Sequence, residues 1–203
     1  MDILFAKQKQ KYLIELQSGL RDKSKKGCID EEIKALVDAI NAHSDYYTTS
    51  SCSGRILLYT ATPDRKKNET EWIFVSHNIV AEEDIRKALV QRKALVQLPS
   101  HVVHSAIVFF RFEPLILHVA CKDLAAAERL LQFCNNSGLK HSGAISLGER
   151  IIVEIIGNDR LDAPIAVDNK LLVTSEGISH FVADANEKMK KNLLRIDRLK
   201  KCF

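Results

Sequence analysis

The order of strand-like and helix-like segments constrains the fold of this chain more than any other feature of the sequence. Two β-prone segments, residues 55–60 and 71–77, are separated by a polar loop, and a helix-like segment over residues 81–93 follows them. Strands followed by a helix recur further along the chain. Strands that form a hairpin run antiparallel, so the sequence predicts an α+β fold with an antiparallel or mixed sheet. The repeated order of strands and helices also suggests an internal duplication of β-hairpin–helix units.

Local signals predict the other elements. Helices are expected over residues 3–20, 31–41 and 123–138, and a long one begins near Ser175. Asp30 fits the N-cap of the second helix, because acidic residues occupy the first turn that follows it. Two further features shape the strands. Pro114 cannot donate to a ladder and should divide the β-prone run over residues 104–121, and a further hairpin should turn near Gly148.

Composition sets the broad class of the protein. Hydrophobic residues make up 46% and charged residues 28% of the 203 residues, which is typical of a globular chain, and we expect a single domain. No apolar run approaches the ~20 residues that span a bilayer, and the N-terminal segment does not resemble a signal peptide. The five cysteines contain no C-x-x-C pair. A cytoplasmic or nuclear protein with reduced thiols and no bound metal is therefore expected.

Basic residues are concentrated at the two ends of the chain. The first 26 residues contain seven Lys or Arg, and the last 17 contain another seven against two acids, while the net charge is only +4. Basic ends on a moderately charged body fit a phosphate-rich partner. Charge alone fits solvated helix faces equally well.

Residues 48–55, TTSSCSGR, are the strongest candidate for a binding segment. Backbone N–H groups around small residues can converge into an anion-binding nest, in which Gly54 permits close approach and Arg55 grips a carboxylate or phosphate. The alternative is a tight turn before a strand. The sequence contains no G-x-G-x-x-G, P-loop or G-x-S-x-G motif. A nucleophilic Cys52 would need His77 or His118 as its base, and no acid stands in a recognisable triad order.

Several segments together resemble one family along nearly the whole chain. YYTTSSCSGRI, WIFVSH, FEPLILHVAC and NNSGLKHSGAI are similar to segments of the tRNA wybutosine-synthesizing protein 3 family, whose signature is S-x-S-S-C-x-G-R. Thr48 departs from the serine that begins this signature. The resemblance implies an S-adenosylmethionine-dependent methyltransferase without a Rossmann fold. It also implies methylation of the N-4 ring nitrogen of the tricyclic wybutosine precursor, beside the anticodon of phenylalanine tRNA.

The resemblance also assigns roles to residues of this chain. Catalytic roles are expected for His77 as the first choice of proton acceptor, Asp30 as the second, and Cys52 in shaping the pocket. The residues expected to bind the cofactor are Ser50, Ser51, Gly54, Arg55, His118 and Ser142. Two other functions remain open on the residues alone: an RNA-binding module that uses the Ser-Ser-Cys-x-Gly-Arg segment as an anion nest, and a hydrolase that uses Cys52 or a serine.

Overall fold

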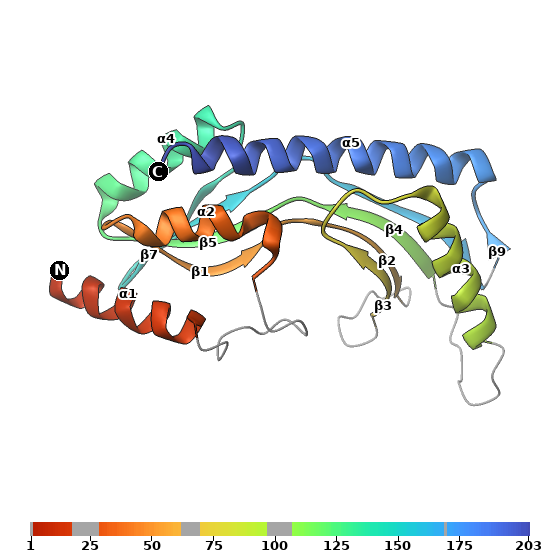
Figure 1. The fold of residues 1–203 in the computed structure, drawn as a ribbon, viewed down its shortest axis with the longest axis horizontal. Helices are drawn as coiled ribbons and strands as arrows, with labels where there is room; N and C mark the ends of the chain where they lie inside the picture. Colours follow the sequence, from red (N-terminus) through yellow and green to blue (C-terminus); the bar gives the residue numbers. More distant parts are fainter. Residues whose placement is uncertain (1, 18–28, 62–69, 97–106, 169) are drawn as a thin grey trace. The chain divides into compact units, whose positions relative to one another are not determined.

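The structure, a computed structural model, describes residues 2–17, 29–61, 70–96, 107–168 and 170–203 (Figure 1). The chain divides into two compact units. Unit 1 comprises Met1–Ser53, Pro114–Asn158 and Asn192–Phe203, and unit 2 comprises Gly54–Glu113 and Asp159–Lys191. Each unit contains its own β-sheet, and every strand pair in the described part of the chain is antiparallel. The predicted α+β class is confirmed, whereas the single domain and the internal duplication stay predictions.

Unit 1 is built on a four-stranded sheet in the order β1–β5–β7–β6. Its elements are α1 (Asp2–Gln17), α2 (Glu31–Ala42), β1 (Tyr46–Cys52), β5 (Ile116–Cys121), α4 (Leu124–Asn136), β6 (Gly143–Leu147), β7 (Ile151–Ile156) and the C-terminal end of α5 (Ser175–Lys200). Successive strand residues face opposite sides of the sheet. Tyr46 accordingly faces the core side, where its hydroxyl donates to the Ala126 carbonyl of α4, and Tyr47 faces α1, where its ring contacts Phe5 and Tyr12. Helices α2 and α4 thus cover one face of the sheet and α1 the other (Figure 1).

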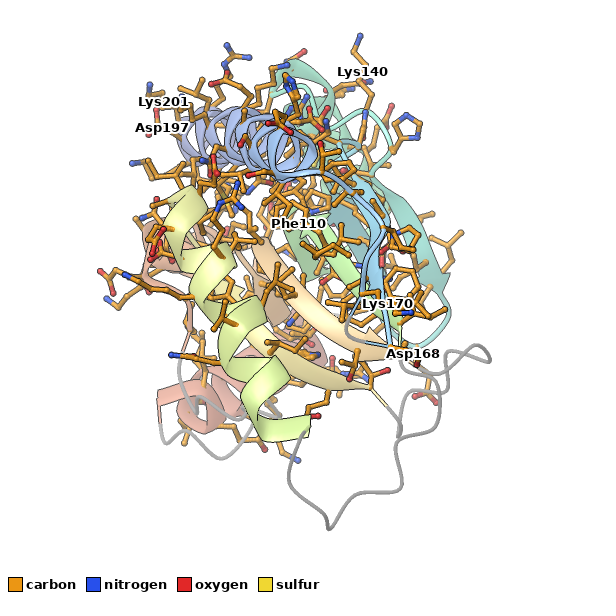
Figure 2. All side chains as sticks on the ribbon, turned by 90° about the vertical axis from the view of Figure 1, so that its right-hand side faces the viewer. Phe110, Lys140, Asp168, Lys170, Asp197 and Lys201 are labelled. Carbon is orange, nitrogen blue, oxygen red and sulfur yellow. The ribbon has the colours of Figure 1, made fainter. Side chains whose placement is uncertain are left out.

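Unit 2 is built on a five-stranded sheet in the order β3–β2–β4–β8–β9. Its elements are β2 (Arg55–Ala61), β3 (Glu71–Ser76), α3 (Glu82–Val96), β4 (Ile107–Glu113), β8 (Leu161–Val167), β9 (Lys170–Leu171) and the N-terminal part of α5. Phe110 of β4, labelled in Figure 2, stacks on Phe181 of α5 with ring centroids 6.1 Å apart. Asn186 of α5 binds both the N–H and the carbonyl of Val80. The first contact attaches α5 to one face of this sheet, and the second attaches it to the segment that leads into α3.

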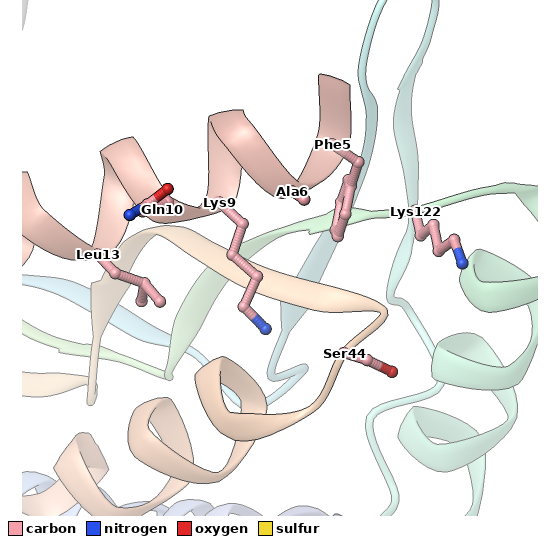
Figure 3. Close-up of a pocket in the computed structure, with 7 residues that line it drawn as sticks. All are labelled: Phe5, Ala6, Lys9, Gln10, Leu13, Ser44 and Lys122. Carbon is pink, nitrogen blue, oxygen red and sulfur yellow. The ribbon is translucent and has the colours of Figure 1, made fainter. Parts of the chain in front are cut away.

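A groove of about 380 Å³ lies between α1 and the turn that leads into β1 (Figure 3). Lys9, one of the basic residues near the N-terminus, extends from α1 in this groove and donates to the His43 carbonyl oxygen at 2.5 Å. Burial lowers the pKa of Lys9, and the Asp45 carboxylate partly opposes that shift. The ammonium of Lys9 therefore serves an internal contact.

Most of the locally signalled elements are confirmed. Pro114 separates β4 from β5, the β6–β7 hairpin turns around Gly148, and α5 begins at Ser175. Asp123 caps α4 by accepting from the Ala126 N–H at 2.7 Å, and Gly138 ends the helix with a φ of +83°. None of the helices in the described part is long and apolar enough to cross a membrane.

Candidate functional site

The signature segment forms a strand, and this overturns both the nest and the tight-turn interpretation of residues 48–52. Strand β1 pairs with β5 along the whole range Tyr46–Cys52, with one bulge between Thr48 and Ser50. In a strand, successive N–H groups point in alternate directions along the ladder, so they cannot converge on one anion. Ser53 and Gly54 lie between β1 and β2, and Gly54 takes a φ of +95° that favours glycine.

A row of three polar side chains lies on the face of the unit 1 sheet that Tyr47 shares, opposite the core side. Ser50 of β1 lies opposite His118 of β5, which lies opposite Glu154 of β7. The His118 Nδ1 is 2.8 Å from the Ser50 hydroxyl, and its Nε2 is 3.0 Å from the Glu154 carboxylate. A carboxylate accepts, so His118 donates through Nε2–H, and in a neutral ring Nδ1 would then accept the Ser50 proton. We call Ser50, His118 and Glu154 the polar row.

The other residues of unit 1 that we predicted to form the site do not all lie together. Cys52 lies two residues beyond Ser50 and faces the same side of the sheet, whereas Ser51 lies opposite Leu117 and faces the other side. Ser142 uses its hydroxyl locally, donating to the Leu139 carbonyl at 2.8 Å and accepting from the Ile156 N–H at 3.4 Å. The sequence therefore brings Ser50, Cys52 and His118 to one face, and the expected joint role of the two serine hydroxyls does not fit the strand.

Thr48, the one departure from the family signature, has a structural environment. It is buried, its N–H donates to the Asn41 Oδ1 at 2.8 Å, and its hydroxyl accepts from the Asn41 Nδ2 at 3.0 Å. Threonine and serine offer the same hydroxyl for this contact. The pair fastens β1 to helix α2.

Two buried polar side chains hold Ser53. Asp30 stands at the N-cap of α2 as predicted, but its side chain makes no cap hydrogen bond. Its Oδ2 instead accepts from the Ser53 N–H at 2.9 Å and from the Ser53 hydroxyl at 3.1 Å. Asn192 of α5, which is fully buried, donates to the Ser53 carbonyl at 2.7 Å and accepts from the Leu115 N–H at 2.8 Å. The residue that precedes Gly54 is thus fixed at its N–H, hydroxyl and carbonyl.

Arg55 is engaged inside unit 2. Its Nε donates to the Glu113 carboxylate at 2.7 Å, and its guanidinium carbon lies 4.4 Å from the centre of the Trp72 ring. The β2–β4 register explains this ion pair, because it places Glu113 opposite Arg55. An incoming carboxylate or phosphate would have to displace Glu113, so the anion contact that we expected for Arg55 competes with an internal ion pair.

The same carboxylate links Arg55 to a second arginine. Arg111 donates to Glu113 at 3.1 Å and to Asp162 at 2.8 Å, and its guanidinium lies over the Tyr59 ring. Burial lowers the pKa of Arg111, but the hydrogen bond and charge of Asp162 outweigh burial and raise it overall. We call this set the arginine–aromatic cluster, and its members are Arg55, Tyr59, Trp72, Arg111, Glu113 and Asp162.

His77, which follows β3, has a defined tautomer. Its Nδ1 lies 2.9 Å from the Gly54 carbonyl oxygen, which can only accept. The Nδ1 therefore carries a proton, and in the neutral ring the lone pair is on Nε2. This is the arrangement that a general base requires.

Of the two histidines that could activate Cys52, His118 is already engaged. Cys52, Cys121, Cys134 and Cys202 are free thiols, and Cys52 is partly exposed. The histidine on the face that Cys52 shares is His118, and both of its ring nitrogens are bound within the polar row. His118, held in this way, is not available to deprotonate the thiol.

Two thiols should resist alkylation in the folded protein. Burial raises the pKa of Cys121 and of Cys134 to about 12, so both stay protonated at pH 8.5, and only a thiolate reacts. Iodoacetamide at pH 8.5 should modify Cys52 and Cys202 and leave the two buried thiols unmodified, as read by peptide mass mapping. Addition of urea should make all four reactive. Modification of Cys121 before Cys52 in the native protein would contradict the described burial.

Comparison with known proteins agrees with this fold and these motifs. The family model Methyltransferase TYW3 matches residues 7–203. The zebrafish (Danio rerio) tRNA wybutosine-synthesizing protein 3 homolog is 39% identical over 90% of this chain and 69% of its own length. The Schizosaccharomyces pombe tRNA wybutosine-synthesizing protein 3 is 35% identical over 90% of this chain and 75% of its own. The solved structure of the PH1069 protein from Pyrococcus horikoshii superposes with a TM-score of 0.85 and 29% identity, covering 97% of this chain and 94% of that one. The chain therefore belongs to the Methyltransferase TYW3 family.

Proposed function

We propose that this protein is an S-adenosylmethionine-dependent tRNA methyltransferase of wybutosine biosynthesis that acts in the cytoplasm. Its proposed substrate is phenylalanine tRNA that carries the tricyclic wybutosine precursor, and the methylated atom is N-4. The match to the family model over residues 7–203 carries the proposal, because it includes every residue assigned to the site. The names of the zebrafish and fission-yeast relatives support the assignment to tRNA wybutosine synthesis.

The polar row offers groups of the kind that bind such a methyl donor. S-adenosylmethionine supplies an electrophilic methyl group on a sulfonium cation and carries hydroxyl, amino and carboxylate groups. A hydroxyl, an imidazole and a carboxylate fit these groups, and the Glu154 carboxylate complements a positive charge. His118 and Glu154 each keep 30% of their side-chain surface exposed, so a ligand can reach them. We assign donor binding to Ser50 and His118.

His77 is the proton acceptor in this proposal. Methylation of a ring nitrogen that bears hydrogen releases a proton. A base whose pKa lies near the operating pH removes this proton most effectively. The Gly54 carbonyl fixes the ring tautomer that leaves Nε2 basic. Asp30, the second choice, is buried, and its Oδ2 already holds two groups of Ser53. The different surroundings of the two side chains favour His77 as the base, and we assign Asp30 a positioning role.

Two measurements test the proposed function. Purified protein should add one methyl group to the wybutosine precursor of hypomodified phenylalanine tRNA when isotopically labelled S-adenosylmethionine is supplied, as read by nucleoside mass spectrometry. Calorimetry should show that the donor binds the protein without tRNA. A protein that binds tRNA, but neither binds the donor nor transfers the label, would be the non-catalytic RNA-binding module instead.

The basic C-terminal helix should contribute to tRNA affinity through phosphate contacts. Two of its lysines, and Lys201 directly after it, also pair with acids of the helix: Lys190 with Glu187, and both Lys200 and Lys201 with Asp197 (Asp197 and Lys201 are labelled in Figure 2). A variant with four lysines replaced by glutamine tests this contribution: Lys190, Lys191, Lys200 and Lys201. It should bind tRNA more weakly, and its binding should depend less steeply on salt. Asp197→Asn should act in the opposite direction, because it releases two ammonium groups from their carboxylate.

Filter binding of labelled tRNA over a range of salt concentrations measures both effects. Equal affinity of the lysine variant and the native protein at low salt would remove the helix from the tRNA-binding surface.

A further inference from the structure

Trp72, the single tryptophan of the chain, has an unusual position for the largest apolar side chain. It lies on β3, the edge strand of the unit 2 sheet, and 51% of its surface is exposed. A bulge in β3 determines which way it points. Phe74 lies opposite Leu58 and Trp72 lies opposite Tyr59, so two residues that a regular strand would put on one face lie on opposite faces. The bulge directs Trp72 to the side of Tyr59 and Arg55.

One face of the Trp72 ring is already occupied. The Arg55 guanidinium lies over it at 4.4 Å, and Glu113 holds that guanidinium by a 2.7 Å hydrogen bond. The ring is therefore fixed in orientation before any ligand arrives. A further planar group can stack only on the opposite face, and the exposed half of the side chain leaves room for it.

The charges around the ring select the kind of ligand. In the arginine–aromatic cluster, two arginines face two carboxylates, Glu113 and Asp162, and each arginine is paired with at least one of them. The cluster is thus neutral in sum and offers little attraction to a phosphate group. A neutral, flat and polarisable group fits it better, and nucleobases stack on aromatic rings with useful affinity in proteins that bind single-stranded nucleic acid.

We infer that Trp72 is a stacking platform for an unpaired nucleobase of the tRNA substrate, held flat by Arg55 and Glu113. This inference rests on the proposed function for the identity of the RNA. The stacked group is a base of tRNA rather than the adenine of the methyl donor, because an edge strand with a half-exposed ring is open to a polynucleotide.

The intrinsic fluorescence of the protein tests the platform directly, since Trp72 is its only tryptophan. Titration with the anticodon stem-loop of phenylalanine tRNA should quench the emission as a base stacks on the indole. A blunt duplex of the same stem sequence, which has no unpaired base, should leave the emission unchanged. Equal quenching by both RNAs would overturn the inference. So would quenching by S-adenosylmethionine in the absence of any effect of the stem-loop, because the ring would then serve the donor.

Affinity measurements on variants complete the test. Trp72→Ala should weaken binding of a labelled stem-loop about tenfold by fluorescence anisotropy, and Trp72→Phe should weaken it less. Leu171→Ala is a matched control, because Leu171 is 43% exposed on β9, the other edge strand of the same sheet. Its affinity should equal that of the native protein. If both Trp72 variants bind as tightly as the native protein, the platform is excluded.

These readouts do not depend on methyl transfer. A protein that shows the stem-loop quenching but transfers no methyl group would refute the proposed reaction and keep the platform. A protein that methylates its tRNA but shows no quenching would refute the platform and keep the proposed reaction.

Discussion

Replacing His77 with asparagine should slow methyl transfer by about 10²- to 10⁴-fold. The asparagine side chain can place its amide N–H near the position of the imidazole Nδ1–H, so the 2.9 Å contact with the Gly54 carbonyl can be kept. It has no nitrogen corresponding to the basic Nε2. The variant therefore removes the proposed proton acceptor and preserves the local fold. The rate should be measured with saturating donor and tRNA, so that the chemical step is compared rather than binding.

The pH profile separates catalysis from structure in this variant. A general base that has already taken up a proton cannot accept another, so the rate of a base-catalysed step falls on the acid side of its pH profile. The asparagine variant should lose this acid limb along with most of its rate. His141→Asn is the matched control, since His141 is exposed and has no proposed role, and its profile should equal that of the native protein. A His77→Asn protein with native rate and native profile would exclude His77 as the base.

The elements that the sequence predicted are those whose causes are local. Helix α4 begins at the Asp123 cap and ends at a glycine with positive φ, and both signals lie within the helix and its flanks. Pro114 separates two strands because it lacks the N–H that a ladder needs. In such cases, the residue type alone determines the backbone.

The errors arose where distant parts of the chain determine the structure. Residues 48–52 look like a loop by composition, but β5, nearly 70 residues away in sequence, supplies a complete hydrogen-bonding partner and makes them a strand. The same pairing explains why Glu154 was missed. Only the alignment of β5 with β7 puts its carboxylate against His118, and the one sequence signal was an acid inside the apolar run IIVEII.

Arg55 shows the limit of assigning a ligand to a charged residue from its type. A guanidinium in a signature motif predicts an anion, and an anion is bound, but it is Glu113 of the neighbouring strand. Asn192 was missed for the opposite reason. An asparagine within an amphipathic helix pattern has no signal that distinguishes a buried position from an exposed one, and burial depends on the turns that pack against it.

Replacing Asn192 with leucine should lower the free energy of unfolding by about 3 kcal/mol. The side chain is fully buried and satisfies two backbone groups, the Ser53 carbonyl and the Leu115 N–H, at 2.7 and 2.8 Å. Leucine has a similar volume but no polar atoms, so both groups would remain buried without a partner, and each such group costs about 1–3 kcal/mol. Greater burial of apolar surface by leucine would offset only part of this loss.

Urea unfolding followed by circular dichroism measures the change. Asn135→Leu is the matched control, because Asn135 is exposed on helix α4 of unit 1 and the same substitution there should change stability by no more than about 0.5 kcal/mol. Equal midpoints for the two variants would mean that the Asn192 contacts do not stabilise the fold. A lower midpoint for Asn192→Leu alone would show that one buried amide, contributed by the C-terminal helix, holds Ser53, the residue that follows the signature strand. The position of Ser53 would then depend on a residue almost 140 positions away, outside the signature motif itself.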